Sequence, residues 1–134
     1  MASVLLVGTN PEIFRELADV LSGRPEIELI YAKTGAEALA LARKNKFALA
    51  VTDEGLEDMS GLNFVHDLLM VNAMTGTAVI SGLSHDDFHE ASEGLGVLFQ
   101  FSPNITRQQA EALWERFEAI NRLSAIVPPE SRNG

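Results

Sequence analysis

The sequence predicts a doubly wound α/β sandwich, in which helices cover both faces of a five-stranded parallel sheet of order 2-1-3-4-5. Five apolar runs alternate with five amphipathic segments, as expected for strand–helix units joined by crossover connections. The apolar runs lack the alternation of a half-exposed strand, which is typical of parallel strands buried on both faces. With 134 residues, 46% of them hydrophobic, the chain is long enough for one domain with a core of its own.

The apolar runs are the expected strands. Each is short and rich in aliphatic or aromatic residues, and most are bounded by Gly, Pro or charged residues. They cover residues 3–8, 27–32, 47–52, 77–82 and 96–101. Together with the helices they predict a flavodoxin-like (βα)5 sandwich.

The amphipathic segments between these runs are the expected helices. The first begins at Pro11, because the side chain of Asn10 can cap it and proline lacks an N–H that would need a partner; it ends before Gly23. The other four cover residues 34–45, 62–71, 86–93 and 106–123. In the last helix, the residues expected to face the core recur at helical spacing: Ala110, Leu113, Phe117 and Ile120.

The composition limits the partners and the location of the protein. Ten Lys and Arg stand against 19 Asp and Glu, a net charge of −9 that argues against a nucleic-acid surface. The apolar runs are shorter than the roughly 20 residues that cross a membrane, and no secretory signal opens the sequence. The sequence contains 0 cysteines, which excludes disulfides, thiolate metal sites and a cysteine nucleophile. We therefore expect a cytoplasmic protein that binds neither nucleic acid nor membranes.

The domain is expected to cover residues 1–123, and residues 124–134 are expected to be a tail or linker. This final stretch carries Pro128 and Pro129 among polar residues, a composition typical of linkers and frayed ends.

The predicted strand order places the functional crevice beyond the carboxyl ends of the first and third strands, where the winding of the sheet reverses. Residues 8–10 and 53–55 are expected to meet there. Asp53 directly follows a buried apolar strand. A carboxylate at such a place can be a loop cap or a solvated charge, but its position at the switch point favours a functional role.

Several motifs, in order along the chain, resemble those of response-regulator receiver domains. They are the string TGAEAL at residues 34–39, the loop Asp53-x-x-Leu56-x-x-Met59-x-Gly61, the pair Ser81-Gly82, the aromatic Phe99, and the segment Phe101-Ser102-Pro103. The resemblance extends over residues 3–123. It implies a role in two-component (phosphorelay) signal transduction.

The resemblance also implies roles for single residues. Asp53 matches the residue that accepts a phosphoryl group from a histidine kinase, with Mg²⁺ neutralising the phosphate charge. Ser81 matches the hydroxyl that binds a phosphate oxygen. Phe99 matches the aromatic switch residue.

The sequence departs from the family pattern around Asp53. Gly8 and Thr9 stand in place of the acidic pair after the first strand, with Asn10 next. Ser102 stands in place of the lysine after the fifth strand, and Glu57 in place of the loop proline. Each missing charge can cost about 2.7–4 kcal/mol of transition-state stabilisation.

These departures predict an atypical, pseudo-receiver-like domain in which Mg²⁺-dependent phosphorylation is lost or severely weakened. Asp53 would be the one carboxylate ligand of Mg²⁺ at a family position, and Asn10 and Glu54 are the candidates to replace the missing ligands. We expect Asp53 to form a hydrogen bond with Thr9 or Asn10 instead. No metal ion or other cofactor is therefore expected.

Three function classes follow. The favoured one is an interaction module without enzymatic activity, whose partner is a protein such as a histidine kinase, a phosphotransferase or an output domain. The alternative is a functioning phosphoacceptor that is phosphorylated on Asp53 and uses Mg²⁺. A third, a flavin-binding relative of the fold, rests only on the turn formed by Gly8, Thr9 and Asn10.

The last helix carries the one tryptophan of the chain, Trp114, beside its apolar stripe. Burial in the core is the favoured interpretation, and a partner interface is the alternative, since tryptophan is enriched at binding hot spots. The resemblance implies that the face of the fourth helix, fifth strand and fifth helix serves output or a homodimer.

Two further groups of residues have both a structural and a functional interpretation. His85 and His89 have the i, i+4 spacing of metal ligands but lack a third ligand, so a solvated start of a helix is favoured. Met59, Met70 and Met74 are expected to fill the core and loops rather than to bind a partner.

Overall fold

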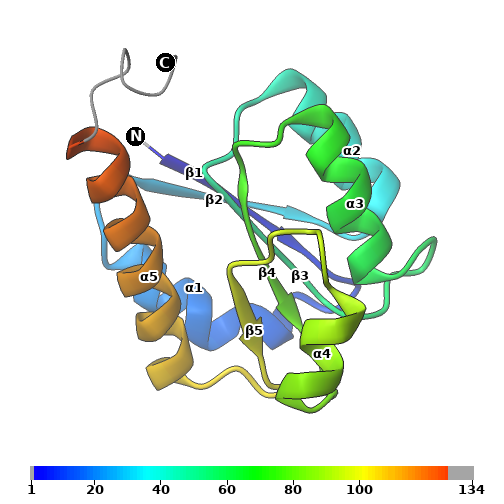
Figure 1. The fold of residues 1–134 in the computed structure, drawn as a ribbon. Helices are drawn as coiled ribbons and strands as arrows, with labels where there is room; N and C mark the ends of the chain where they lie inside the picture. Colours follow the sequence, from blue (N-terminus) through cyan, green and yellow to red (C-terminus); the bar gives the residue numbers. More distant parts are fainter. Residues whose placement is uncertain (1, 127–134) are drawn as a thin grey trace.

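The computed structural model of the protein describes residues 2–126, with side chains described for residues 2–120. A five-stranded parallel sheet of order β2-β1-β3-β4-β5 forms its centre (Figure 1). The strands are β1 (Ala2–Val7), β2 (Ile27–Ala32), β3 (Leu49–Thr52), β4 (Gly76–Ile80) and β5 (Phe99–Phe101). The predicted fold class and strand order are confirmed.

Helices cover both faces of the sheet, α1 and α5 on one and α2, α3 and α4 on the other (Figure 1). They are the short 3-10 helix η1 (Pro11–Phe14), α1 (Arg15–Ser22), α2 (Gly35–Lys44), α3 (Gly61–Val71), α4 (His85–Ala91) and α5 (Arg107–Ile126). No helix within residues 2–126 is both long enough and apolar enough to cross a membrane.

The central strand β1 is apolar from Val4 to Val7 because both of its faces are buried there. In β1, Val4 and Leu6 belong to the core cluster that includes residues of α1 and α5. Leu5 and Val7 belong to the second cluster, which includes residues of α2, α3 and α4. Successive side chains of a strand point to opposite faces, so a strand between two helical layers needs an apolar residue at every position.

Side-chain caps fix where the first helical segments begin. The Asn10 side-chain oxygen accepts a hydrogen bond from the Glu12 N–H at 3.1 Å, as predicted, although the first turn is a 3-10 helix. Thr34 caps α2 by accepting from the Glu37 N–H at 3.1 Å, and the Glu37 carboxylate accepts from the Lys33 N–H at 2.7 Å. This pair resembles a capping box, except that Glu37 accepts from the residue before the N-cap, and it satisfies two N–H groups at the start of α2.

The last strand is shorter than predicted. Gly94 and Gly96 have φ angles of +84° and +66°, in the left-handed region, so the chain still turns where residues 96–98 were expected to be extended. The strand that pairs with β4 is Phe99–Phe101, and the Leu98 N–H just before it donates to the Thr77 carbonyl at 2.7 Å.

Helix α5 differs from the prediction in its buried face. Trp114 is 8% exposed and packs in the core with Leu113 and Phe117, whereas Ile120 is 44% exposed, so the prediction that Ile120 faces the core is wrong. With 20 residues α5 is about 30 Å long, whereas β1 with 6 residues spans about 20 Å, so one end of the helix extends past the sheet. The helix also continues past residue 123 to Ile126; the rest of the predicted tail, 127–134, lies outside the described residues.

Candidate functional site

The carboxyl ends of β1 and β3 lie side by side, as the predicted switch point requires. Val7 is paired with Thr52, so Gly8 and Asp53 leave the sheet from neighbouring strands. The Asp53 N–H donates to the Val7 carbonyl at 2.9 Å. The Asp53 side chain is half-buried, and its Oδ1 accepts a hydrogen bond from the Glu54 N–H at 2.9 Å.

The loop after β3 holds Asp53 through backbone contacts. The Gly61 N–H donates to the Glu54 carbonyl at 2.9 Å, which closes the loop at the start of α3. A Cβ atom added at Gly61 would overlap the carbonyl oxygen of Asp53, so only glycine allows this approach. The Leu56 N–H donates to the Met59 carbonyl at 2.9 Å, which tightens the loop further.

Asp58 joins the same loop to helix α2. Its two carboxylate oxygens accept hydrogen bonds from the Gly35 and Ala36 N–H groups, both at 2.9 Å. These two backbone donors lower the pKa of Asp58 below its ordinary value. No role for Asp58 is predictable from the sequence, because nothing local to residues 53–61 indicates that a helix from another part of the chain begins beside them.

The positions of the family's acidic pair carry no carboxylate, and the first of them, Gly8, has little room for a side chain. Gly8 is buried, and a Cβ atom added there would lie 3.1 Å from the Phe14 ring and 3.2 Å from the Ile13 side chain. Thr9 and Asn10 are exposed, and Asn10 caps η1. Within residues 2–120 neither side chain bonds to Asp53, so the predicted hydrogen bond from Asp53 to Thr9 or Asn10 is wrong; the Glu54 N–H takes that place.

The residues around Asp53 do not fit a Mg²⁺ ion as the family would hold it. Mg²⁺ requires hard oxygen ligands, usually including one or two carboxylates. The Glu54 carboxylate accepts from the Gly82 N–H at 3.2 Å, and the Asn10 oxygen is committed to its cap. Among the side chains described, no three His, Cys, Asp or Glu residues are grouped closely enough to hold a metal ion, and this includes His85 and His89.

Ser81 lies at the carboxyl end of β4, as the resemblance implies, and is buried. Its hydroxyl oxygen accepts a hydrogen bond from the Leu83 N–H at 3.1 Å. The side-chain amide of Gln100, on β5, donates to the Leu83 carbonyl at 2.8 Å and lies 3.4 Å from the Ser81 carbonyl. Gln100 thus connects the loop after β4 to β5 by hydrogen bonds, a role that was not predicted from the sequence.

Ser102 follows β5 and is used within its own loop. Its hydroxyl donates to the Asn104 carbonyl at 2.7 Å and lies 3.0 Å from the Gln109 side-chain oxygen. Gln109 and Thr106 form a capping box, because the Gln109 N–H donates to the Thr106 hydroxyl at 3.1 Å and the Thr106 N–H donates to the Gln109 side-chain oxygen at 3.4 Å. The residue at the lysine position therefore stabilises the start of α5.

Phe99 and Arg116 lie on the face made by α4, β5 and α5. The Arg116 guanidinium is 5.5 Å from the centre of the half-buried Phe99 ring and donates to the Leu98 carbonyl at 2.9 Å. Together with His85 and His89 they line a hollow of about 380 Å³.

Trp114 does not contribute to that face as an exposed side chain. It packs against Phe117 with ring centres 5.3 Å apart, and the Arg24 guanidinium lies 5.1 Å from the centre of its ring. This burial corrects the alternative of a partner interface built on Trp114 and agrees with the favoured core interpretation.

Comparison with known proteins supports the resemblance. No family model matches the chain. A response regulator receiver protein of Anaeromyxobacter sp. (strain Fw109-5) is 35% identical over 98 residues, which are 73% of this chain and 41% of that protein. The chain thus spans about two-fifths of the length of this relative.

Solved structures share the fold at low sequence identity. A response regulator receiver domain from Clostridium thermocellum has a TM-score of 0.74 at 16% identity and covers 92% of this chain and 99% of its own. A chemotaxis response regulator of Vibrio cholerae has a TM-score of 0.76 at 22% identity, over 87% of this chain and 98% of its own. The related sequence, the shared fold and the motif around Asp53 agree, and the chain belongs to the receiver domains of response regulators, the modules of two-component signal transduction.

Proposed function

We propose that this receiver domain works as a pseudo-receiver, which binds protein partners without depending on Mg²⁺-assisted phosphorylation of Asp53. The observation that carries the proposal is the filled space beside Gly8. Any side chain there would require the side chains of Phe14 and Ile13 to shift by a few tenths of an ångström, and Phe14 is fully buried. The site therefore lacks the charge of the family's acidic pair, and the position of Gly8 has little room for a side chain.

The hydrogen bonds of the remaining polar residues support the same proposal. Asn10 and Glu54, the two substitutes for the missing ligands, each accept from a backbone N–H, of Glu12 and Gly82 respectively. Ser102 is an uncharged residue held by Asn104 and Gln109. Phosphoryl transfer depends on positioned positive charge around the phosphate, and two losses in one site can slow it by several orders of magnitude.

The partner classes of the proposal are those of the family: a histidine kinase, a phosphotransferase or an output domain. A homodimer is proposed through the face of α4, β5 and α5, where Phe99, Arg116 and the two histidines line a hollow. No enzymatic step is assigned to the domain itself.

Intact-mass spectrometry after incubation with acetyl phosphate and excess Mg²⁺ tests the proposal. The purified protein is compared with Asp53→Asn, which keeps the side-chain shape but removes the nucleophilic carboxylate. We expect no added phosphoryl mass in either protein.

The opposite result would favour the second function. Asp53 and the buried Ser81 hydroxyl stand at the ends of neighbouring strands, β3 and β4, as in a phosphoacceptor. A phosphoryl mass that appears with Mg²⁺ and is absent from Asp53→Asn would overturn the pseudo-receiver proposal and assign phosphoacceptor activity to Asp53.

A further inference from the structure

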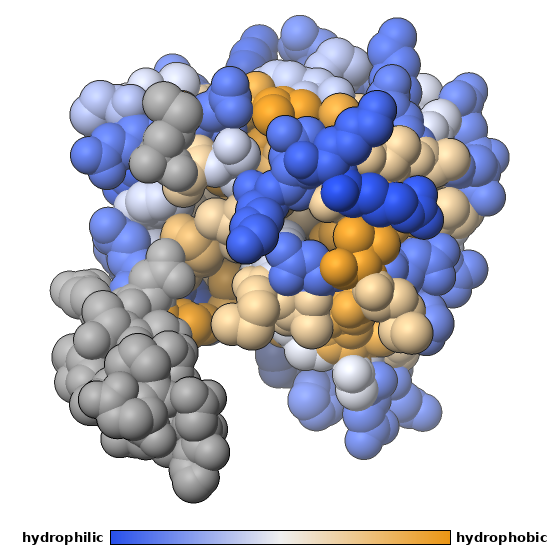
Figure 2. All heavy atoms as spheres, turned by 90° about the horizontal axis from the view of Figure 1, so that it is seen from above, coloured by the Kyte–Doolittle hydropathy of each residue, from blue (hydrophilic) through white to orange (hydrophobic). Residues whose placement is uncertain are grey.

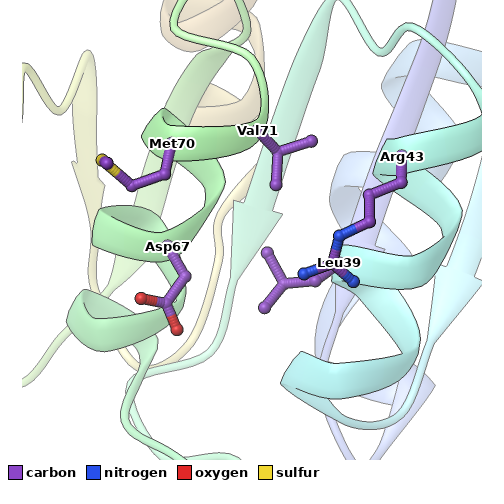
Figure 3. Close-up of a pocket in the computed structure, with 5 residues that line it drawn as sticks. All are labelled: Leu39, Arg43, Asp67, Met70 and Val71. Atoms are coloured by element: carbon purple, nitrogen blue, oxygen red, sulfur yellow. The ribbon is translucent and has the colours of Figure 1, made fainter.

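Two adjoining hollows form a groove between α2 and α3. The first, of about 530 Å³, is lined by Leu39, Arg43, Asp67, Met70 and Val71, and Figure 3 shows Leu39 and Val71 in the space between the two helices. The second, of about 440 Å³, shares Arg43 and Val71 with it and continues along Lys44, Asn45 and Lys46 at the end of α2. We call the two hollows together the α2–α3 groove.

Two methionines at this groove are almost fully exposed. Met70 is 80% exposed and lines the first hollow, and Met74, in the loop after α3, is 84% exposed. The Met74 N–H donates at 3.0 Å to the side chain of Asn72, which lines the second hollow. Met59 packs against the core as predicted, but Met70 and Met74 do not fill the core or a loop. Met70 is exposed because α3 buries Phe64, Val65 and Leu68 on its other side.

The charge at the groove is opposite in sign to that of the chain as a whole. Arg43, Lys44 and Lys46 are exposed, and none of them forms an ion pair with another residue whose side chain is described, whereas the chain carries a net charge of −9. The second hollow has no acidic residue in its lining. The first has one, Asp67, which lies on α3 across from Arg43 (Figure 3) and 3.3 Å from the His66 ring.

The surface of this end of the molecule mixes both kinds of side chain. Figure 2 views the molecule from the end where α2 and α3 finish, and hydrophilic side chains there lie directly beside hydrophobic ones. Methionine side chains adapt to irregular apolar partners, and a basic rim attracts acidic ones.

We infer that the α2–α3 groove is a docking surface for an amphipathic helix of a partner protein, with apolar residues on one face and acidic residues beside them. A groove between two helices suits a third helix, whose apolar face would cover Met70 and Val71. Its acidic residues would meet Arg43, Lys44 and Lys46. Two copies of the protein are not expected to pair groove to groove, because the three basic side chains of one copy would face the same three of the other and repel them.

Docking at the groove does not depend on whether Asp53 is phosphorylated. A peptide of defined sequence can test whether the groove binds such a helix. The probe is a fluorescent synthetic helical peptide with leucine on one face and glutamate on the other, measured by fluorescence anisotropy against the full chain. We expect saturable binding that weakens as NaCl rises from about 50 mM to about 300 mM. A peptide with lysine in place of glutamate is expected not to bind.

Variants locate the binding. The triple variant Arg43→Glu, Lys44→Glu, Lys46→Glu is expected to weaken binding by roughly tenfold or more, since each reversed charge loses one attraction and adds one repulsion. Met70→Ala is expected to weaken it by roughly threefold, because the methionine is exposed and its loss removes apolar contact only. Lys33→Glu is the matched control: it reverses one exposed charge at the opposite end of α2 and should leave binding unchanged.

Three results would overturn the inference. The first is equal binding of the acidic and basic peptides, and the second is full affinity in the triple variant when circular dichroism shows it folded. The third is a self-associated protein in sedimentation equilibrium that becomes monomeric in the triple variant, which would assign the groove to a second copy. The phosphorylation experiment on Asp53 can fail or succeed without changing any of these results.

Discussion

Gly55, in the loop after β3, and Gly61, at the start of α3, differ in what surrounds them. Gly61 lies against the carbonyl oxygen of Asp53, whereas a Cβ atom added at Gly55 would have no neighbour within 4 Å. Gly61→Ala is therefore expected to lower the free energy of unfolding by at least about 2 kcal/mol, because backbone on both sides must move to admit one methyl group. Urea unfolding followed by circular dichroism measures the change.

Gly55→Ala is the matched control in the loop before Gly61. It is expected to change the unfolding free energy by less than about 0.5 kcal/mol, since the position is exposed and open. Equal losses in the two variants would contradict the account of how Gly61 fixes Asp53.

Single residues were predictable from the sequence where their partners are near them in the chain. Asn10 caps η1 two residues away, as its side-chain chemistry predicts. Asp58 and Gln100 were missed, since their partners Gly35 and Leu83 are brought to them only by the fold. The wrong partner for Asp53 has the same cause: adjacency at the switch point was predicted, but the direction of each side chain was not.

At the scale of elements, Asp58 links the loop after β3 to the first turn of α2. Its folded pKa is lowered from the ordinary value of 3.8 by the Gly35 and Ala36 N–H groups. A lowered folded pKa gives stability that is fully present above the ordinary value and is lost as the pH falls through the folded pKa. Asp58→Asn is thus expected to destabilise the domain near neutral pH, and the difference from wild type should shrink as the pH falls below 3.8.

Urea unfolding of both proteins from about pH 7 to about pH 3 measures this difference. Glu57→Gln serves as the control: the residue is an exposed neighbour, and within the described part of the chain its carboxylate has no hydrogen-bond partner. A difference between Asp58→Asn and wild type that stays constant over this range would show that the carboxylate charge does not stabilise the start of α2.

Helix α5 shows why existence and type of an element were easier to predict than its buried face. The spacing of Ala110, Leu113 and Phe117 predicted the helix and three of its core residues correctly. The helical spacing of apolar residues does not indicate how far the sheet extends under the helix. Ile120 was therefore predicted to be buried, although it is exposed. Trp114 is buried and widens the apolar face of the helix.

For the whole molecule, the charges missing around Asp53 can be put back. Thr9→Asp together with Ser102→Lys is expected to raise Mg²⁺-dependent phosphorylation by acetyl phosphate at least about tenfold, because a second carboxylate and a cation then stand at the family's positions. Intact-mass spectrometry over time measures the rate. Thr9 is exposed and Ser102 is half-buried, so the larger side chains can extend toward solvent at both positions.

Adding Gly8→Asp to this pair of substitutions distinguishes the effect of charge on phosphorylation from the effect of packing on stability. The added side chain must move Phe14 and Ile13, and it is expected to lower the unfolding free energy by about 1–3 kcal/mol. The Asp53→Asn version of each variant must show no phosphoryl mass. A restored pair that takes up phosphate no faster than wild type would mean that the missing charges are not what limits the site.

The amide of Gln100 fastens the loop after β4 to β5 through the Leu83 and Ser81 carbonyls. Under the proposed function, this loop keeps one arrangement, and the domain does not report a signal by moving it. Its influence on a partner is then set by how many copies are present and how tightly each one binds. Synthesis and degradation of the chain become the points at which a cell would adjust its output, and a mutation that alters abundance would act on the pathway as a kinase acts on an ordinary receiver.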